Sequence, residues 1–142
     1  MILTLNPAYH RHINHGRAMK DNGKHVLDAR GMVLGRLAVT VAGLLRGKYN
    51  ASYAHNAAPH NAVTVLNCEH VRISGSKAVG KVYYRHSGHP GGLRRTKLHD
   101  LMLRSPATVL RAAVHGMLPR NRLRDGFMSM LRVHANEGAV RR

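Results

Sequence analysis

The chain has 142 residues, 44% of them apolar, which suits one compact domain with a buried core and excludes a wholly disordered basic tail. It carries 23 Lys and Arg against 6 Asp and Glu, a formal net charge of +17, so most cations lack an acidic partner within the chain. The imbalance predicts a polyanionic partner, and nucleic acid is favoured over an acidic membrane surface because no lipidation signal or basic amphipathic surface helix stands out.

Residues 1–24 are expected to form a basic extension ahead of the folded domain. The first twenty residues hold Arg11, Arg17, Lys20 and three histidines but no acid. This composition permits a mitochondrial address, and an RNA-binding extension fits it equally well.

The first predicted elements are a short strand over residues 25–29 and a helix that begins at Leu34. The helix is indicated by apolar residues that recur on one face, namely Leu37, Ala38, Val41, Leu44 and Leu45. Gly47 is well placed to end this helix as its C-terminal glycine.

A loop is expected over residues 49–61, followed by a covered strand over 62–68 and a second short strand over 71–74. Cys68, the single cysteine, excludes an intramolecular disulfide, favours a reducing compartment and is expected to be a buried small hydrophobe. Residues 76–97 form a long basic segment that is rich in glycine, and residues 98–104 are expected to be a short helical turn.

Ser105 and Pro106 predict a helix start, because serine suits the N-cap and proline the first helical position. Pro119 is expected to stop this helix, and helical spacing returns over residues 123–131. Strand, helix, strand and then helices predict a single α/β layer fold with some parallel pairing, without internal repeats.

The basic segment from Lys81 to Lys97 holds five formal cations, two histidines, two tyrosines and three glycines, but no acid. Arginine and lysine neutralise phosphates, and glycine lets the backbone approach RNA closely. Tyr83 and Tyr84 could stack on unpaired bases, or one could point into the protein and the other out. The segment as a whole predicts RNA contact.

Two smaller basic clusters follow helix ends. Arg120, Arg122 and Arg124 come just after the proline that stops a helix, where they could reach a nucleic-acid backbone. Arg46 and Lys48 follow the first helix, and there the helix dipole alone would also favour cations.

Enzymatic sites are not supported by the sequence. The stretch G-L-L-R-G-K over residues 43–48 has three residues between its glycines instead of four, and Tyr49 stands where a Mg²⁺-binding hydroxyl is needed. The pairs His10/His12 and His86/His89 have ligand-like spacing but lack cysteine pairs or nearby acids, so no metal is expected. Asp28 is expected to hydrogen-bond locally. We therefore expect no catalytic residues, no cofactor and no small-molecule substrate.

Five motifs are similar, in order and spacing, to the ribosomal protein L13 family of bacteria and organelles. They are K-H-V-L-D-A-R-G-M-V-L-G-R-L-A, L-L-R-G-K, V-L-N-C-E-H-V, K-V-Y-Y-R-H-S-G-H-P-G-G-L and H-G-M-L-P-R-N-R-L. The resemblance spans about residues 25–135, which leaves a short basic tail over 136–142. It implies a three-layer α/β/α domain around a small, mainly parallel sheet.

The resemblance also implies a structural role in the large ribosomal subunit, with binding and stabilisation of its rRNA during assembly and translation. Partners would be that rRNA and neighbouring large-subunit proteins, with no membrane. The residues that match the family's motifs and are expected to face RNA are Arg36, Arg46, Lys48, Lys77, Lys81, Tyr84, Arg85, His86, Ser87, Gly88, His89, Gly91 and Gly92. Position within the basic segments adds Arg94, Arg95, Lys97, Arg120, Arg122 and Arg124.

The chain departs from the family's pattern in the loop after Tyr53, which reads A-H-N-A-A-P-H-N and has lost both acids of that pattern. This drift, with added basic charge and histidine, predicts a diverged mitochondrial protein of the matrix, with bacterial cytoplasm or plastid stroma as alternatives. Two other hypotheses are an RNA-processing enzyme that depends on a metal or histidine, and a DNA-compacting protein without sequence preference.

Overall fold

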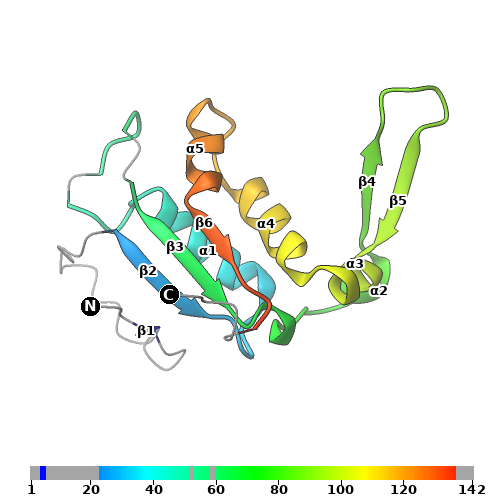
Figure 1. Ribbon diagram of the computed structural model, residues 1–142, viewed down its shortest axis with the longest axis horizontal. Helices are drawn as coiled ribbons and strands as arrows, with labels where there is room; N and C mark the ends of the chain where they lie inside the picture. Colours follow the sequence, from blue (N-terminus) through cyan, green and yellow to red (C-terminus); the bar gives the residue numbers. More distant parts are fainter. Residues whose placement is uncertain (1–3, 6–22, 52, 58–59, 137–142) are drawn as a thin grey trace.

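The computed structural model describes residues 4–5, 23–51, 53–57 and 60–136 (Figure 1). Most of the expected basic extension, with its ligand-like pair His10/His12, and nearly all of the C-terminal tail therefore lie outside the described residues. Within the described residues, no helix combines the length and the apolar character that a membrane span requires.

A four-stranded sheet organises the domain, and its strand order is β1-β2-β3-β6. All three neighbouring pairs are parallel, and the register sets Leu27 and Val133 on either side of Val65. The strands are β1 (Thr4–Leu5), β2 (Lys24–Asp28), β3 (Ala62–Leu66) and β6 (Leu131–Val133). The expected α/β class with a small parallel sheet is confirmed, and β1 shows that part of the predicted extension joins this sheet.

Helices α1 (Leu34–Leu45) and α4 (Pro106–Met117) pack against each other, and α1 lies behind the sheet in Figure 1. Alternate residues of β3, Val63 and Val65, are completely buried and belong to the same core cluster as Leu37 of α1. Each such aliphatic side chain contributes about 1.5–3 kcal/mol when it is fully buried. The apolar face predicted for the first helix is therefore the face of α1 that packs into the core.

The opposite face of the sheet is less covered by the described residues. Val26 and Thr64 are half-buried there, and Arg132 is exposed. The described part of the chain thus shows one well-packed helical layer, and the second layer of the expected α/β/α arrangement stays a prediction.

Gly47 ends α1 as predicted. Its φ is +68°, a left-handed conformation that favours glycine, and its N–H donates to the carbonyl of Leu44. The N–H of Lys48 donates to the carbonyl of Gly43, which completes a Schellman motif. Asn61 adds a third bond at this end, because its buried side-chain amide donates to the Leu44 carbonyl at 2.8 Å.

The carboxyl ends of β2 and β3 are joined by side chains. Asp28 accepts a hydrogen bond from the Asn67 amide at 2.9 Å and another from the backbone N–H of Arg30 at 3.0 Å. The expected local role of Asp28 is therefore confirmed. Cys68 follows Asn67, is buried, and burial raises the pKa of its thiol to about 12.

Two expectations about the middle and end of the chain were wrong. Residues 71–74 do not form a strand, because only an isolated bridge joins Arg72 to Val33, just before α1. Helical spacing over 123–131 ends earlier than expected, since α5 covers Leu123–Ser129 and Leu131 begins β6. Leu131 still fills the core, so the apolar position was right and its element was not.

Candidate nucleic-acid interface

The basic segment forms an antiparallel hairpin that stands away from the body of the protein (Figure 1). Its strands are β4 (Val82–His86) and β5 (Leu93–Lys97), and helices α2 (Lys77–Gly80) and α3 (Leu98–Arg104) lie at its base. The N–H of Leu98 donates to the carbonyl of Lys81, which closes the base, and the Leu98 side chain is buried. The sequence located this basic segment but did not predict that it is a hairpin.

Cations occupy both faces of the hairpin. Arg85 lies directly across from Arg94, and Arg95 lies across from Tyr84 on the other face. The Arg95 guanidinium carbon is 5.8 Å from the centroid of the Tyr84 ring, and that ring is 64% exposed. Between described residues, no cation of the hairpin is paired with a carboxylate. Like charges directly opposite each other destabilise a strand pair, so an external anion would relieve this repulsion.

The two tyrosines point to opposite sides, as one of the two predicted arrangements requires. Tyr83 is half-buried, and Lys81 Nζ lies 5.0 Å from the centroid of its ring. The Tyr83 hydroxyl is buried and has no hydrogen-bond partner within the part of the chain that the structure describes. Tyr84 is thus the ring that is accessible for stacking.

The hairpin turn depends on glycine. Gly88 and Gly91 have φ of +90° and +73°, and a Cβ added at Gly92 would overlap the Ser87 hydroxyl and approach the His89 carbonyl at 2.9 Å. Larger residues would therefore distort this turn.

His86 is oriented by the same turn. Its Nδ1 accepts the Gly88 N–H at 2.9 Å, so in the neutral ring Nε2 carries the proton. The hairpin therefore offers an imidazole N–H donor beside its arginines.

The three arginines after Pro119 differ in their surroundings. Arg120 and Arg122 are exposed in the connection between α4 and α5. Arg124 is half-buried, and its guanidinium donates to the carbonyls of Pro119 at 2.9 Å and Leu118 at 3.3 Å. Arg124 thus clamps the end of α4, which is a structural role that the sequence did not reveal.

The residues in or near α1 and α2 that were predicted to face RNA also differ in their exposure. Arg36 and Lys48 are exposed, as is Lys77 on α2. Arg46 is half-buried, and its guanidinium donates to the Tyr53 hydroxyl at 2.8 Å. Tyr53 had no sequence signal, because its contact depends on how the loop folds back over the end of α1.

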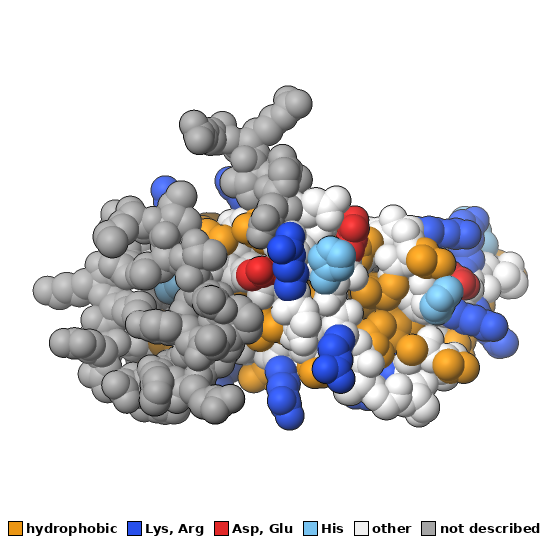
Figure 2. All heavy atoms as spheres, turned by 90° about the horizontal axis from the view of Figure 1, so that it is seen from below, with side chains coloured by type: hydrophobic (Ala, Val, Ile, Leu, Met, Phe, Trp, Pro, Cys, Tyr) orange, Lys and Arg blue, Asp and Glu red, His pale blue; other side chains and the backbone are white. Residues whose placement is uncertain are grey.

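The structure brings some of the predicted residues together and separates others. Arg46 lines a hollow that Pro119 and Asn121 also line, so the cluster after α1 and the cluster after α4 are neighbours. The hairpin lies apart from both (Figure 1). Seen from below, Lys and Arg side chains are spread over the described surface with few acids among them, and several gather at the hairpin end (Figure 2). Contact of these residues with RNA stays a prediction.

The side chains that could bind a metal ion are not clustered in the described residues. Within them, no group of three or more His, Cys, Asp or Glu is placed to hold a metal ion. On α3, His99 Nδ1 lies 3.7 Å from a carboxylate oxygen of Asp100, and both side chains are largely exposed.

Fold and surface together define a small, strongly basic α/β protein with a projecting cationic hairpin and few carboxylates to neutralise it. Residues 22–139 match the family Ribosomal protein L13. The chain belongs to this family, and it is a ribosomal protein and not an enzyme.

Close relatives bear the name "Large ribosomal subunit protein uL13". The relative from Mycobacterium bovis is 48% identical over 111 residues, which cover 78% of this chain and 76% of the relative. The relative from Herpetosiphon aurantiacus is 46% identical over 112 residues, covering 79% and 78% of the two chains. The relative from Streptomyces griseus is 42% identical over 113 residues, covering 80% and 77%.

Proposed function

We propose that the chain is a structural constituent of the large ribosomal subunit and binds its rRNA with the hairpin as the principal contact. The observation that carries the proposal is the set of five hairpin cations without a carboxylate partner among the described residues, with Arg85 opposite Arg94. A polyanion would remove this repulsion and release its own condensed counterions.

The proposed contacts divide into positioning and stacking groups. Arginines and lysines would bind phosphates, which orient the protein without reading sequence, and Tyr84 would stack on an unpaired base. The phosphate-binding group consists of Arg36, Lys48, Lys77, Lys81, Arg85, Arg94, Arg95, Lys97, Arg120 and Arg122. His86 and the backbone of the glycine turn would add hydrogen-bond donors. Neighbouring large-subunit proteins are expected to contact surfaces that RNA leaves open.

The proposed cellular location is the bacterial cytoplasm. The expected mitochondrial location has no support from the three relatives named above, since all three are bacterial. The added basic charge that suggested it is explained equally well by more extensive RNA contact.

The decisive experiment is a salt titration of binding between the full chain and purified large-subunit rRNA, with duplex DNA as the competitor. If the five hairpin cations alone neutralise about five phosphates, affinity should fall several hundred-fold between roughly 50 and 200 mM salt, and contacts by the other cations would make the fall steeper. Duplex DNA should compete poorly, and the chain should co-sediment with large subunits in gradients. Equal binding to duplex DNA, or absence from the subunit fraction, would contradict the proposal.

A further inference from the structure

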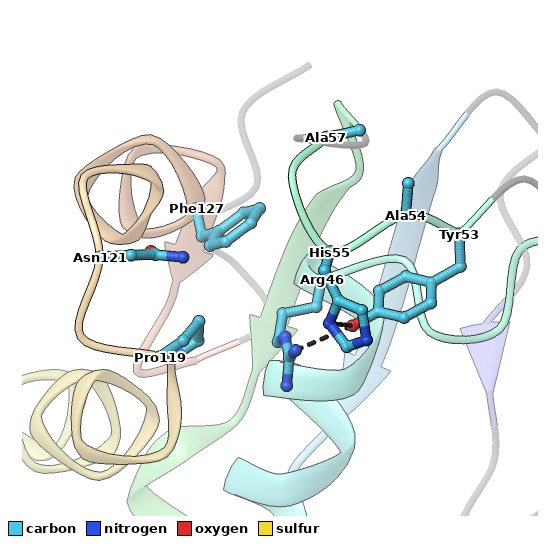
Figure 3. A pocket seen from close by; sticks show the side chains of 8 residues that line it. All are labelled: Arg46, Tyr53, Ala54, His55, Ala57, Pro119, Asn121 and Phe127. Carbon is cyan, nitrogen blue, oxygen red and sulfur yellow. Dashed lines mark hydrogen bonds between the residues drawn. The ribbon is translucent and has the colours of Figure 1, made fainter.

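A small hollow lies between the end of α1 and the connection from α4 to α5, separate from the hairpin (Figure 3). Its volume is about 190 Å³. Pro119, Asn121 and Phe127 line it from one side, and Arg46, Tyr53 and His55 line it from the other. Pockets for drug-sized ligands usually measure about 300–1,000 Å³, so this one suits a single ring system and not a whole cofactor.

One wall of the hollow is fixed before any ligand arrives. The Arg46 guanidinium donates to the Tyr53 hydroxyl at 2.8 Å, and that hydroxyl lies 3.3 Å from His55 Nδ1. The Tyr53 hydroxyl accepts from Arg46, and its hydrogen bond with His55 Nδ1 can run in either direction, according to the tautomer of the imidazole. The two rings meet edge to face, with centroids 5.3 Å apart and planes at 68°. Two aromatic rings and a guanidinium are thus preorganised beside the cavity.

The charge of this wall favours an electron-rich ligand. Arg46 is half-buried, and the partner of its guanidinium is the neutral hydroxyl of Tyr53. No carboxylate is among the residues that line the hollow. Exposed Arg120 and Arg122 flank Asn121 in sequence, so phosphates on either side of an inserted group would meet cations.

The other wall offers a hydrogen-bonding edge. The backbone N–H of Asn121 donates to Pro119, and its backbone carbonyl accepts the Arg124 N–H at 3.1 Å. Its side-chain amide has no hydrogen-bond partner in the described part of the chain, and it points toward the cavity in Figure 3. This amide presents both a donor and an acceptor, the combination that recognises the edge of a base.

We propose that this hollow binds one unpaired nucleobase of rRNA, stacked against the aromatic wall and hydrogen-bonded by Asn121 and Arg46. The inference rests on the proposed function and adds a second contact of a different kind. Proteins recognise RNA largely through splayed bases that stack on aromatic rings or arginine planes and are bonded at their edges. The hairpin would position the protein on phosphates, whereas the hollow would capture a base.

The test compares the full chain with the double variant Tyr53→Ala/Asn121→Ala in binding to purified large-subunit rRNA. Affinity should fall about 5- to 150-fold, the range for loss of one stacked base. The dependence of affinity on salt should keep its slope, because no phosphate contact is removed. Probing with dimethyl sulfate and a carbodiimide should show one unpaired base that the wild-type chain protects and the variant leaves reactive.

Tyr49→Ala is the matched control, since Tyr49 lies in the same loop, is exposed and is not among the residues lining the hollow. It should bind and protect like the wild type. Thermal melting checks the fold, and the single variant Asn121→Ala, at an exposed position, should lose protection of the same base. Unchanged affinity for purified rRNA and unchanged base protection in both variants would overturn the inference. That result is also the one expected if a side chain of a neighbouring protein, and not a base, fills the hollow in the ribosome. Failure of the wild-type chain to bind rRNA would instead contradict the proposed function.

Discussion

The body and the hairpin are specified by different physics. In the body, parallel strands and two long helices bury an apolar core in which Leu37, Val41 and Val63 are fully covered. In the hairpin, every Arg and Lys is exposed, and Arg85 faces Arg94 across the strand pair. Burial of apolar surface therefore determines the body, whereas the hairpin depends on its glycine turn, and the proposed RNA contact would neutralise its cations.

This difference has a consequence for stability. An isolated two-stranded hairpin is only marginally stable in water, and at the base of this one Leu98 is buried and donates its backbone N–H to the Lys81 carbonyl. The protein would keep its body folded while the hairpin acquires its full stability on the partner. Changes in the two regions should accordingly separate folding from binding.

The largest effect is expected from a charge in the body. Leu44→Asp places a carboxylate in the core-facing side of α1 and should cost more than about 4 kcal/mol, enough to abolish cooperative melting. Circular dichroism measures the loss. Val39→Asp is the control, because Val39 is 60% exposed on the same helix and should melt nearly as the wild type does. A normal melt for Leu44→Asp would refute the burial of that position.

A charge reversal in the hairpin should have the opposite signature. Arg94→Glu with Arg95→Glu should lower rRNA affinity about 100-fold or more and reduce the slope of log affinity against log salt by about two, while melting stays unchanged. The control is Arg111→Glu with Arg132→Glu, two exposed arginines outside the hairpin with the same change in net charge. If both pairs lose affinity equally, net charge and not the hairpin accounts for binding.

Sequence patterns predicted the parts of the fold in which local signals agree with packing. The face of α1, its end at Gly47, and the limits of α4 between Pro106 and Pro119 were all readable, because glycine and proline restrict the backbone where apolar spacing begins or ends. The hairpin was not readable, since its strands read V-Y-Y-R-H and L-R-R-T-K and do not alternate apolar with polar residues. The strand that begins at Leu131 was missed for another reason, because β6 has only three residues and its apolar positions continue the helical spacing of the preceding segment.

The candidate site was predictable in composition but not in geometry. Basic segments identified Arg94, Arg95 and Arg122, yet no local pattern indicates that Arg124 turns back onto backbone carbonyls. The contact between Arg46 and Tyr53 likewise depends on a loop that returns to the end of α1. Such tertiary contacts have no periodic signature.

The reactivity of the Cys68 thiol measures how accessible the core of the body is to solvent. Burial raises its pKa from 9.0 to about 12, so the folded protein keeps the thiol protonated while the unfolded chain loses that proton above pH 9. This contribution to stability should be present below pH 9 and fall by about 1.4 kcal/mol per pH unit toward pH 12. Thiol labelling at pH 8 should proceed only as fast as the protein opens. Rapid labelling of the native protein would show that the core is accessible there.

Arg122 and Arg124, which lie at the start of α5, allow the same comparison between two arginines close in sequence. Arg124→Ala removes charge-assisted hydrogen bonds to Leu118 and Pro119 and should lower the free energy of unfolding by about 1–2 kcal/mol. Arg122→Ala should leave melting unchanged and weaken rRNA binding, because Arg122 is exposed. Denaturant titration and filter binding on both variants separate the two roles, and equal destabilisation would contradict the distinction.

The smallest predicted effect is a gain in folding stability from a substitution in the body, away from the residues proposed to bind RNA. Gly116 lies in α4 with open space where an alanine methyl group would stand, so Gly116→Ala meets no neighbouring atom and should raise stability by about 0.5–1 kcal/mol through helix propensity. The same substitution at Gly92 would force a Cβ against Ser87 and His89, distort the hairpin turn and weaken rRNA binding while the body melts normally. One kind of substitution would thus stabilise the body in one place and impair binding in the other. A loss of rRNA affinity in Gly116→Ala would show that α4 also contacts RNA and that the division between the two regions is less sharp than their packing suggests.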